Sequence, residues 1–179
     1  MGKWLTQDLI GYPDGWNNFA YCNNDIINII DLLGALNLNL YPKGSAVATN
    51  AGKCTTFDRM GFSVGIHGDA NGVSSTGNAN DRMTASELAK SIRDAGWNGT
   101  DTVYLLSCNV GNGDFPQELA NALGEGVRVQ APDGYIWFDQ DGKAYLGDMD
   151  ENGNYKPNPD RGFKGYIGKG SSGQGSVGE

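Results

Sequence analysis

Short apolar runs alternate with amphipathic segments along the middle of the chain. Residues 61–66 and 102–107 are rich in β-branched and aromatic side chains and are bounded by glycine or polar residues, which is typical of buried strands. A third run of the same kind spans residues 127–131. With helical segments between them, the three runs predict an α/β fold with a mostly parallel central sheet, flanking helices and right-handed crossovers.

Two helices are expected between these strands. The first follows Thr84, which forms a capping-box pattern with Glu87. The second is expected to begin at Asp114 as the N-cap, with Gln117 in the reciprocal position. In the first helix the apolar residues fall at i, i+3, i+4 and i+7, as an amphipathic helix requires: Ala85, Leu88, Ala89 and Ile92.

The segments around these elements are rich in polar residues and glycine. Residues 68–83 predict one long loop, and because it starts directly after His67 we expect it to be functional. Residues 135–138 and 143–146 flank an Asp-Gly turn signal and predict a C-terminal β-hairpin.

These patterns divide the chain into three parts. Residues 1–60 form a helical and aromatic extension packed on the core, with an apolar helix expected over residues 26–36. Residues 61–168 form the catalytic core with its hairpin, and residues 169–179 form a disordered, low-complexity tail.

Composition narrows the function. The chain has 179 residues and a net charge of −8, which argues against binding nucleic acid or an anionic membrane, because phosphate binding needs clustered Lys and Arg. No apolar run approaches the roughly 18 residues of a membrane span, and no charged-then-apolar leader precedes the chain, so we expect neither a transmembrane helix nor a signal peptide. Three cysteines and one histidine fit neither a disulfide framework nor a metal knuckle, so no metal site is expected.

The single histidine and one of the three cysteines are candidate catalytic residues. His67 follows the first predicted strand and Cys108 the second, and ligands of open α/β sheets bind at the carboxyl ends of the strands. A thiol and an imidazole brought together there can act as nucleophile and base, with the N–H groups of Gly68 and Cys108 as oxyanion donors. The alternative is that each is a structural residue, a buried thiol and a satisfied imidazole. Because His67 precedes Cys108, the papain and transglutaminase orders are excluded, and no Gly-x-Ser-x-Gly elbow is present.

Four segments, in this order and spacing, resemble the caspase-like cysteine peptidases of the bacterial toxin branch. They are GIHGD, MTASELAKSIRDAG, VYLLSCNVGNGDFPQELANALG and VRVQAPDGYIWFDQDGK. The similarity covers about residues 61–145. It extends to the self-processing peptidase domain of large clostridial and RTX toxins, and to modules at the C-termini of polymorphic toxins.

The resemblance implies a caspase-like three-layer sandwich with His67 as base and Cys108 as nucleophile. It also implies a secreted toxin or effector, delivered into a target cell by a secretion system and acting in the cytoplasm. There it would cleave a peptide bond in a target protein, or in itself, through a thioester. A cognate immunity protein, plausibly basic, would be its partner. The implied pocket for the substrate residue before the cut bond is lined by Asp69, Ser107, Ala131, Pro132 and Trp137.

Two alternatives stay open: a deamidase or acyltransferase toxin of the same fold, and a non-catalytic binding module whose dyad has lapsed. No cofactor is expected. The related toxin domains are activated by inositol hexakisphosphate in a basic patch, which the acidic charge disfavours here. A basic cluster in the tail keeps that activation under consideration: Lys156, Arg161, Lys164 and Lys169. Residues 148–153 resemble half of a calcium loop, but Pro159 occupies the position of the bidentate glutamate, which favours a solvated turn.

Overall fold

The computed structural model describes residues 36–57 and 60–170. These residues belong to one compact unit of the chain, residues 35–179. The helix expected over residues 26–36, apart from its last residue, and most of the tail expected over residues 169–179 lie outside the described residues.

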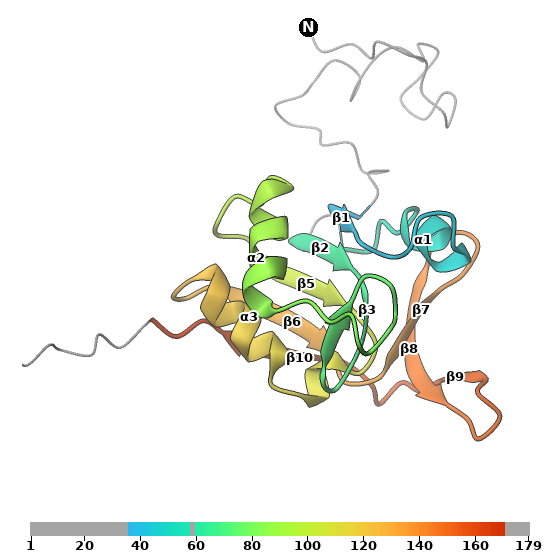
Figure 1. Cartoon of the computed structure of the whole chain (residues 1–179). Helices are drawn as coiled ribbons and strands as arrows, with labels where there is room; N and C mark the ends of the chain where they lie inside the picture. Colours follow the sequence, from blue (N-terminus) through green and yellow to red (C-terminus); the bar gives the residue numbers. More distant parts are fainter. Residues whose placement is uncertain (1–35, 58–59, 171–179) are drawn as a thin grey trace, which may run out of the picture. The chain divides into compact units, whose positions relative to one another are not determined.

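A five-stranded sheet forms the centre of this unit (Figure 1). Its order is β1-β2-β5-β6-β10; the first four strands are parallel, and β10 runs antiparallel along β6. The predicted α/β fold with a mostly parallel sheet is therefore confirmed. The strands are β1 Leu38–Asn39, β2 Phe62–Gly65, β5 Val103–Leu106, β6 Arg128–Pro132 and β10 Phe163–Ile167.

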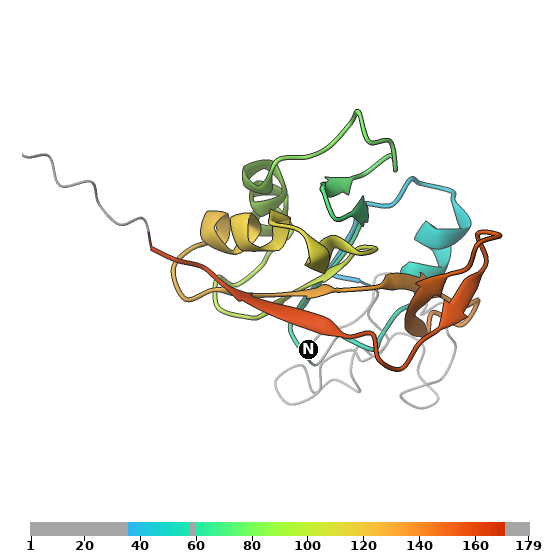
Figure 2. The ribbon, with the colours of Figure 1, turned by 90° about the horizontal axis from the view of Figure 1, so that it is seen from below.

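Two helices cover one face of the sheet: α2 (Ala85–Asp94) and α3 (Phe115–Leu123). Figure 2 shows them on the same side of β6 and β10. Alternate strand residues such as Val103 and Leu105 point to this face, and each fully buried aliphatic side chain contributes roughly 1.5–3 kcal/mol. The helix side of the core includes Leu88, Ala89, Ile92, Leu119, Ala120 and Leu123.

The two helix starts differ from each other. Thr84 forms the predicted capping box with Glu87, which confirms that prediction. Asp114 is the N-cap of α3, which confirms the predicted start, but the predicted capping box is wrong: Asp114 has helical backbone angles (φ −86°, ψ −19°) and its side chain makes no capping hydrogen bond. An N-cap side chain reaches the first-turn N–H groups only from an extended backbone.

The opposite face of the sheet carries a second apolar cluster. Tyr104 and Leu106 of β5 point to it and pack against residues from the segment before β2. That segment includes α1 (Ala46–Ala51), which begins at Ser45, whose Oγ accepts the Ala48 N–H at 3.1 Å. Other members of this cluster are Leu36, Tyr41, Cys54, Phe57, Ile136 and Phe138.

The loop predicted over residues 68–83 is only partly a loop. Its first half forms an antiparallel hairpin of β3 (His67–Asp69) and β4 (Gly72–Ser74). The tight turn forms because Asp69 Oδ1 accepts the Asn71 N–H at 2.7 Å, and Val73 is fully buried behind it. The prediction was wrong because a three-residue strand with one buried apolar side chain leaves no periodic signal.

The predicted C-terminal hairpin is confirmed as β7 (Tyr135–Phe138) and β8 (Ala144–Met149). A third strand, β9 (Tyr155–Pro157), extends it on the β8 side. Gly142 in the turn has φ +82°, and a Cβ there would lie 2.5 Å from the backbone of Lys53, so this position requires glycine. Within residues 36–57 and 60–170, no helix has the length and apolar character needed to cross a bilayer.

Candidate functional site

The two candidate catalytic residues lie just beyond the C-terminal ends of neighbouring strands, His67 at the start of β3 and Cys108 in the turn after β5. β2 and β5 pair in parallel as Val64↔Leu105 and Gly65↔Leu106, a constant offset of 41 (105 − 64). His67 and Cys108 have the same offset (108 − 67 = 41). The Ile66 N–H donates to the Leu106 carbonyl at 3.3 Å, and the Ser107 N–H then donates back to the Leu105 carbonyl at 3.1 Å, so the pairing ends before His67 and Cys108. In Figure 1 both strands point toward α1 and β7.

Tyr41 contacts His67 directly and contacts β5 just before Cys108. Its ring meets the His67 imidazole edge to face, with centroids 4.9 Å apart and an interplanar angle of 77°. Its hydroxyl donates to the carbonyl of Leu106, two residues before Cys108, at 2.7 Å. Burial, more than the neighbouring thiols, raises the pKa of Tyr41 well above its usual value, so the phenol stays protonated.

The Cys108 thiol is in its neutral form at rest. The side chain is partly buried, and burial raises its pKa. Its Sγ donates to the Ile136 carbonyl at 3.5 Å. Within the part of the chain that the structure describes, no hydrogen bond joins Cys108 to His67, and apo enzymes often form that contact only when substrate binds.

His67 is partly buried at one end of a polar cleft of about 150 Å³. Burial lowers the pKa of the imidazole, so it is neutral near pH 7 and able to accept a proton. A Cβ on Gly77 would lie 3.3 Å from the ring, so the backbone of that residue also contacts the imidazole. The other residues lining the cleft are Gly68, Asp69, Ser74, Asn78, Ala79 and Arg82.

Gly68 brings the two strand ends into close contact. A Cβ at this position would lie 2.3 Å from Ser107 Oγ and 2.8 Å from the Gly72 carbonyl, so glycine is required. Ser107 is fully buried, and among the described residues its hydroxyl has no hydrogen-bond partner. This contact sets the spacing between the His67 hairpin and the Cys108 loop.

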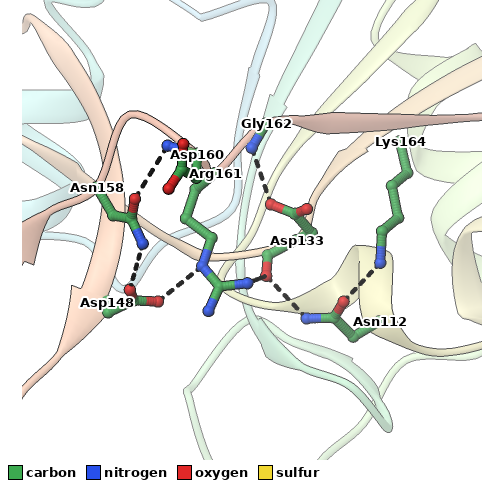
Figure 3. Close-up of polar contacts among 8 residues, drawn as sticks. All are labelled: Asn112, Asp133, Asp148, Asn158, Asp160, Arg161, Gly162 and Lys164. Carbon is green, nitrogen blue, oxygen red and sulfur yellow. Dashed lines mark hydrogen bonds and ion pairs between the residues drawn. The ribbon is translucent and has the colours of Figure 1, made fainter.

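The loop after Cys108 is held in a defined shape. Asn109 has φ 54°, the left-handed region that asparagine tolerates better than most residues. Its N–H donates to the Gly134 carbonyl at 2.8 Å. Figure 3 shows the next contacts: Asn112 Nδ2 donates to the Asp133 carbonyl at 2.8 Å, and Lys164 Nζ donates to Asn112 Oδ1 at 2.7 Å.

The five residues expected to line the substrate pocket are placed in different environments. Asp69 lies in the cleft beside His67, where its ion pair with Arg82 (2.6 Å) lowers its pKa. Ser107 is buried under Gly68, and Ala131 and Pro132 are buried in β6. Trp137 is 41% exposed on β7.

Trp137 lies in a second depression. It lines a more apolar groove of about 460 Å³ between β7 and α1, together with Val47 and Phe138. Ile136, whose carbonyl accepts the Cys108 thiol, lines the same groove. His67 therefore lines the polar depression, whereas Cys108 is not among the residues lining either of these two depressions and is linked to the apolar one only through its hydrogen bond to the Ile136 carbonyl.

Sequence patterns identified neither Tyr41 nor Arg82 as a site residue. Tyr41 lies in the extension expected over residues 1–60, and Arg82 lies at the end of the polar stretch before α2. No local pattern marks either residue, since each acquires its role through a contact across 13 or 26 positions (82 − 69 and 67 − 41).

Two of the four basic tail residues, Arg161 and Lys164, bind to the protein itself. Arg161 pairs with Asp148 at 2.7 Å, and Lys164 donates to Asn112 (Figure 3). Asp150 accepts the N–H groups of Asn152 and Asn154, as in a solvated turn. Across residues 36–57 and 60–170, no group of three or more His, Cys, Asp or Glu side chains could hold a metal ion.

Comparison with known proteins places the chain in a family. A family model described as a domain of unknown function (DUF8616) matches residues 36–146. The chain belongs to the DUF8616 family. The matched range includes Tyr41, His67 and Cys108, and therefore the whole candidate site.

One curated relative of this DUF8616 chain is the uncharacterized protein YibJ of Escherichia coli (strain K12). It is 35% identical over 114 residues, which are 63% of this chain and 47% of YibJ. The chain thus spans about half the length of this curated relative. No solved structure matches the chain.

Proposed function

We propose that the protein is a cysteine peptidase of caspase-like fold in which His67 is the general base and Cys108 the nucleophile. One observation carries the proposal: the two residues follow the C-terminal ends of adjacent parallel strands, and Tyr41 contacts His67 with its ring and the Leu106 carbonyl, two residues before Cys108, with its hydroxyl. The element order supports the finer fold assignment, because the histidine strand and the cysteine strand are neighbours and an antiparallel strand closes the edge beyond β6.

The proposed reaction begins from two neutral groups. An imidazole nitrogen of His67 takes the Cys108 thiol proton as Sγ attacks the substrate carbonyl carbon, and an oxyanion forms. The N–H groups of Cys108 and Gly68 stabilise that oxygen. The C–N bond then breaks, the imidazolium gives its proton to the leaving amine, and a thioester remains on Cys108.

Water completes the cycle. His67 takes a proton from a water molecule as its oxygen attacks the thioester carbon. The C–S bond breaks, the carboxylic acid leaves, and the proton returns to Cys108. The burial that raises the pKa of the thiol and lowers that of the imidazole suits this sequence, since neither group carries a charge before substrate binds.

The two depressions give the substrate a direction. The leaving amine must lie near His67, which donates the proton, and the polar cleft of Asp69 and Arg82 adjoins that residue. The acyl part must lie near Cys108, whose thiol donates to the carbonyl of Ile136, a residue that lines the apolar groove containing Trp137. We therefore expect a protein substrate with an apolar residue on the acyl side of the bond.

The biological setting follows from the resemblance to toxin peptidases. In that setting the domain is a toxin or effector that a secretion system delivers into a target cell, where it acts in the cytoplasm on a protein. A cognate immunity protein would neutralise it in the producing cell, and the net charge of −8 favours a basic partner.

The test uses alkylation of Cys108 by iodoacetamide, followed by peptide mass analysis. In the wild type the rate should rise as His67 loses its proton below pH 6.5, stay level near neutrality, and rise again as the thiol itself ionises above pH 9. In His67→Gln the first rise should disappear. Cys54, which is fully buried, is the internal comparison. Labelling of Cys108 no faster than Cys54, with no change in His67→Gln, would support the lapsed-dyad alternative.

Expression inside bacterial cells tests the activity. Cys108→Ala and His67→Gln should abolish growth inhibition, whereas Lys90→Ala, on the exposed face of α2, should not. Full toxicity of Cys108→Ala would refute the proposal. The mass of a modified target protein separates peptide cleavage from deamidation or acyl transfer, which leave the target chain intact.

A further inference from the structure

Tyr41 is the residue of the site that has no assigned role. It lies 26 positions before His67 (67 − 41), between β1 and α1. Only 5% of its surface is exposed, and no step of the proposed reaction uses it. Its ring nevertheless contacts His67, and its hydroxyl bonds the carbonyl of Leu106, two residues before Cys108.

The position of the Tyr41 ring is fixed on several sides. Its hydroxyl donates to the Leu106 carbonyl of β5 at 2.7 Å, and its ring packs edge to face on Phe138 with centroids 6.2 Å apart. A Cβ on Gly65 would lie 2.7 Å from the ring, so the β2 backbone also contacts it. A ring held by two strands of the sheet is a rigid surface for a third group to pack against.

That third group is the imidazole of His67. The Tyr41 ring and the Gly77 backbone both contact it, the first at a centroid distance of 4.9 Å. Among the described residues His67 makes no side-chain hydrogen bond, so these contacts are what limits its rotation. The other ionisable groups near the imidazole are Asp69 and Arg82, which are paired with each other across the cleft.

We propose that Tyr41 is a positioning residue whose ring holds the His67 imidazole in the orientation from which it takes the Cys108 proton. The inference depends on the proposed function, because it assigns Tyr41 a part in the same proton transfer. An aromatic ring suits the role since it contacts the imidazole both before and after the imidazole gains charge. Misplacement of a reacting group by about 1 Å can cost about a hundredfold in rate.

The experiment compares Tyr41→Phe, which keeps the ring, with Tyr41→Met, which keeps most of the volume without a ring. The first readout is the pH profile of Cys108 alkylation by iodoacetamide. We expect Tyr41→Phe to stay within about threefold of the wild type near pH 7, and Tyr41→Met to lose roughly tenfold or more, as misplacement of the base requires. The second readout is the NMR signal of His67, which is unambiguous because the chain has one histidine.

Each outcome decides the question. If His67→Gln slows alkylation and Tyr41→Met does not, the proposed function stands and the role of Tyr41 is refuted. If both Tyr41 variants are slowed equally, the hydroxyl and not the ring is responsible, and the inference is again overturned. If His67→Gln itself has no effect, the proposed function fails first. Thermal unfolding of both variants shows whether either has lost the fold. Tyr41→Phe loses only the hydrogen bond to the Leu106 carbonyl, so we expect it to stay folded and to allow a direct comparison of alkylation rates with the wild type.

Discussion

Gly113→Ala should separate the two loops that carry the dyad. Gly113 ends the turn after Cys108, and a Cβ there would lie 1.7 Å from the carbonyl oxygen of Ala70, at the tip of the β3–β4 hairpin. To reach even the 3.0 Å limit of observed contacts, the hairpin tip must move by about 1.3 Å (3.0 − 1.7). Because His67 is three residues from Ala70, such a shift also displaces the base.

The expected loss of stability in Gly113→Ala is measured against a matched control variant, Gly162→Ala. Overpacking costs about 1–3 kcal/mol, whereas replacing glycine by alanine returns about 0.4–1 kcal/mol through the unfolded chain. Gly162→Ala shares the second effect alone, since a Cβ there meets nothing within 4 Å. The two variants should therefore differ by about 1–3 kcal/mol in the free energy of unfolding, or roughly 2–12 °C in Tm.

Urea unfolding of both variants measures this difference, and alkylation of Cys108 measures the effect on the site. Gly113→Ala should unfold at lower urea and react more slowly at pH 7 than Gly162→Ala. Equal urea midpoints and equal alkylation rates would refute the reasoning, because the hairpin could then not lie against the Cys108 loop.

Three further predictions concern stability and are read from urea midpoints. Burial lowers the pKa of His67, so below pH 6.5 the unfolded chain binds more protons than the folded one. The free energy of unfolding of the wild type should therefore decrease as the pH is lowered through this range, and parallel curves for wild type and His67→Gln would contradict this. Thr84→Ala removes the α2 cap and should cost about 1 kcal/mol, whereas exposed Ser86→Ala should not; equal midpoints would argue against the capping box. Ser107→Ala should lower the free energy of unfolding by less than about 0.5 kcal/mol, because the Ser107 hydroxyl has no partner among the described residues. Ser63→Ala loses hydrogen bonds to Asn37 and should lower it by about 1–3 kcal/mol; the reverse order would be inconsistent with these contacts.

The elements that could be predicted are those with a local signal. The strand runs 61–66, 102–107 and 127–131 became β2, β5 and β6, and α2 begins at its capping box, because composition and spacing over a few residues specify such elements. β1 and β10 could not be predicted in this way. β1 has two residues and β10 contains a glycine, and both exist because a neighbouring strand offers its edge.

The sequence by itself determined which two side chains carry the candidate chemistry and that parallel strands bring them to one edge of a sheet. Tertiary structure alone decided their surroundings: Tyr41 against His67, the Ile136 carbonyl at the Cys108 thiol, and the cleft beside Asp69 and Arg82. Burial also shifts the two pKa values in opposite directions. Periodicity and propensity act over a few positions, whereas desolvation and packing sum contacts from residues far apart in the chain.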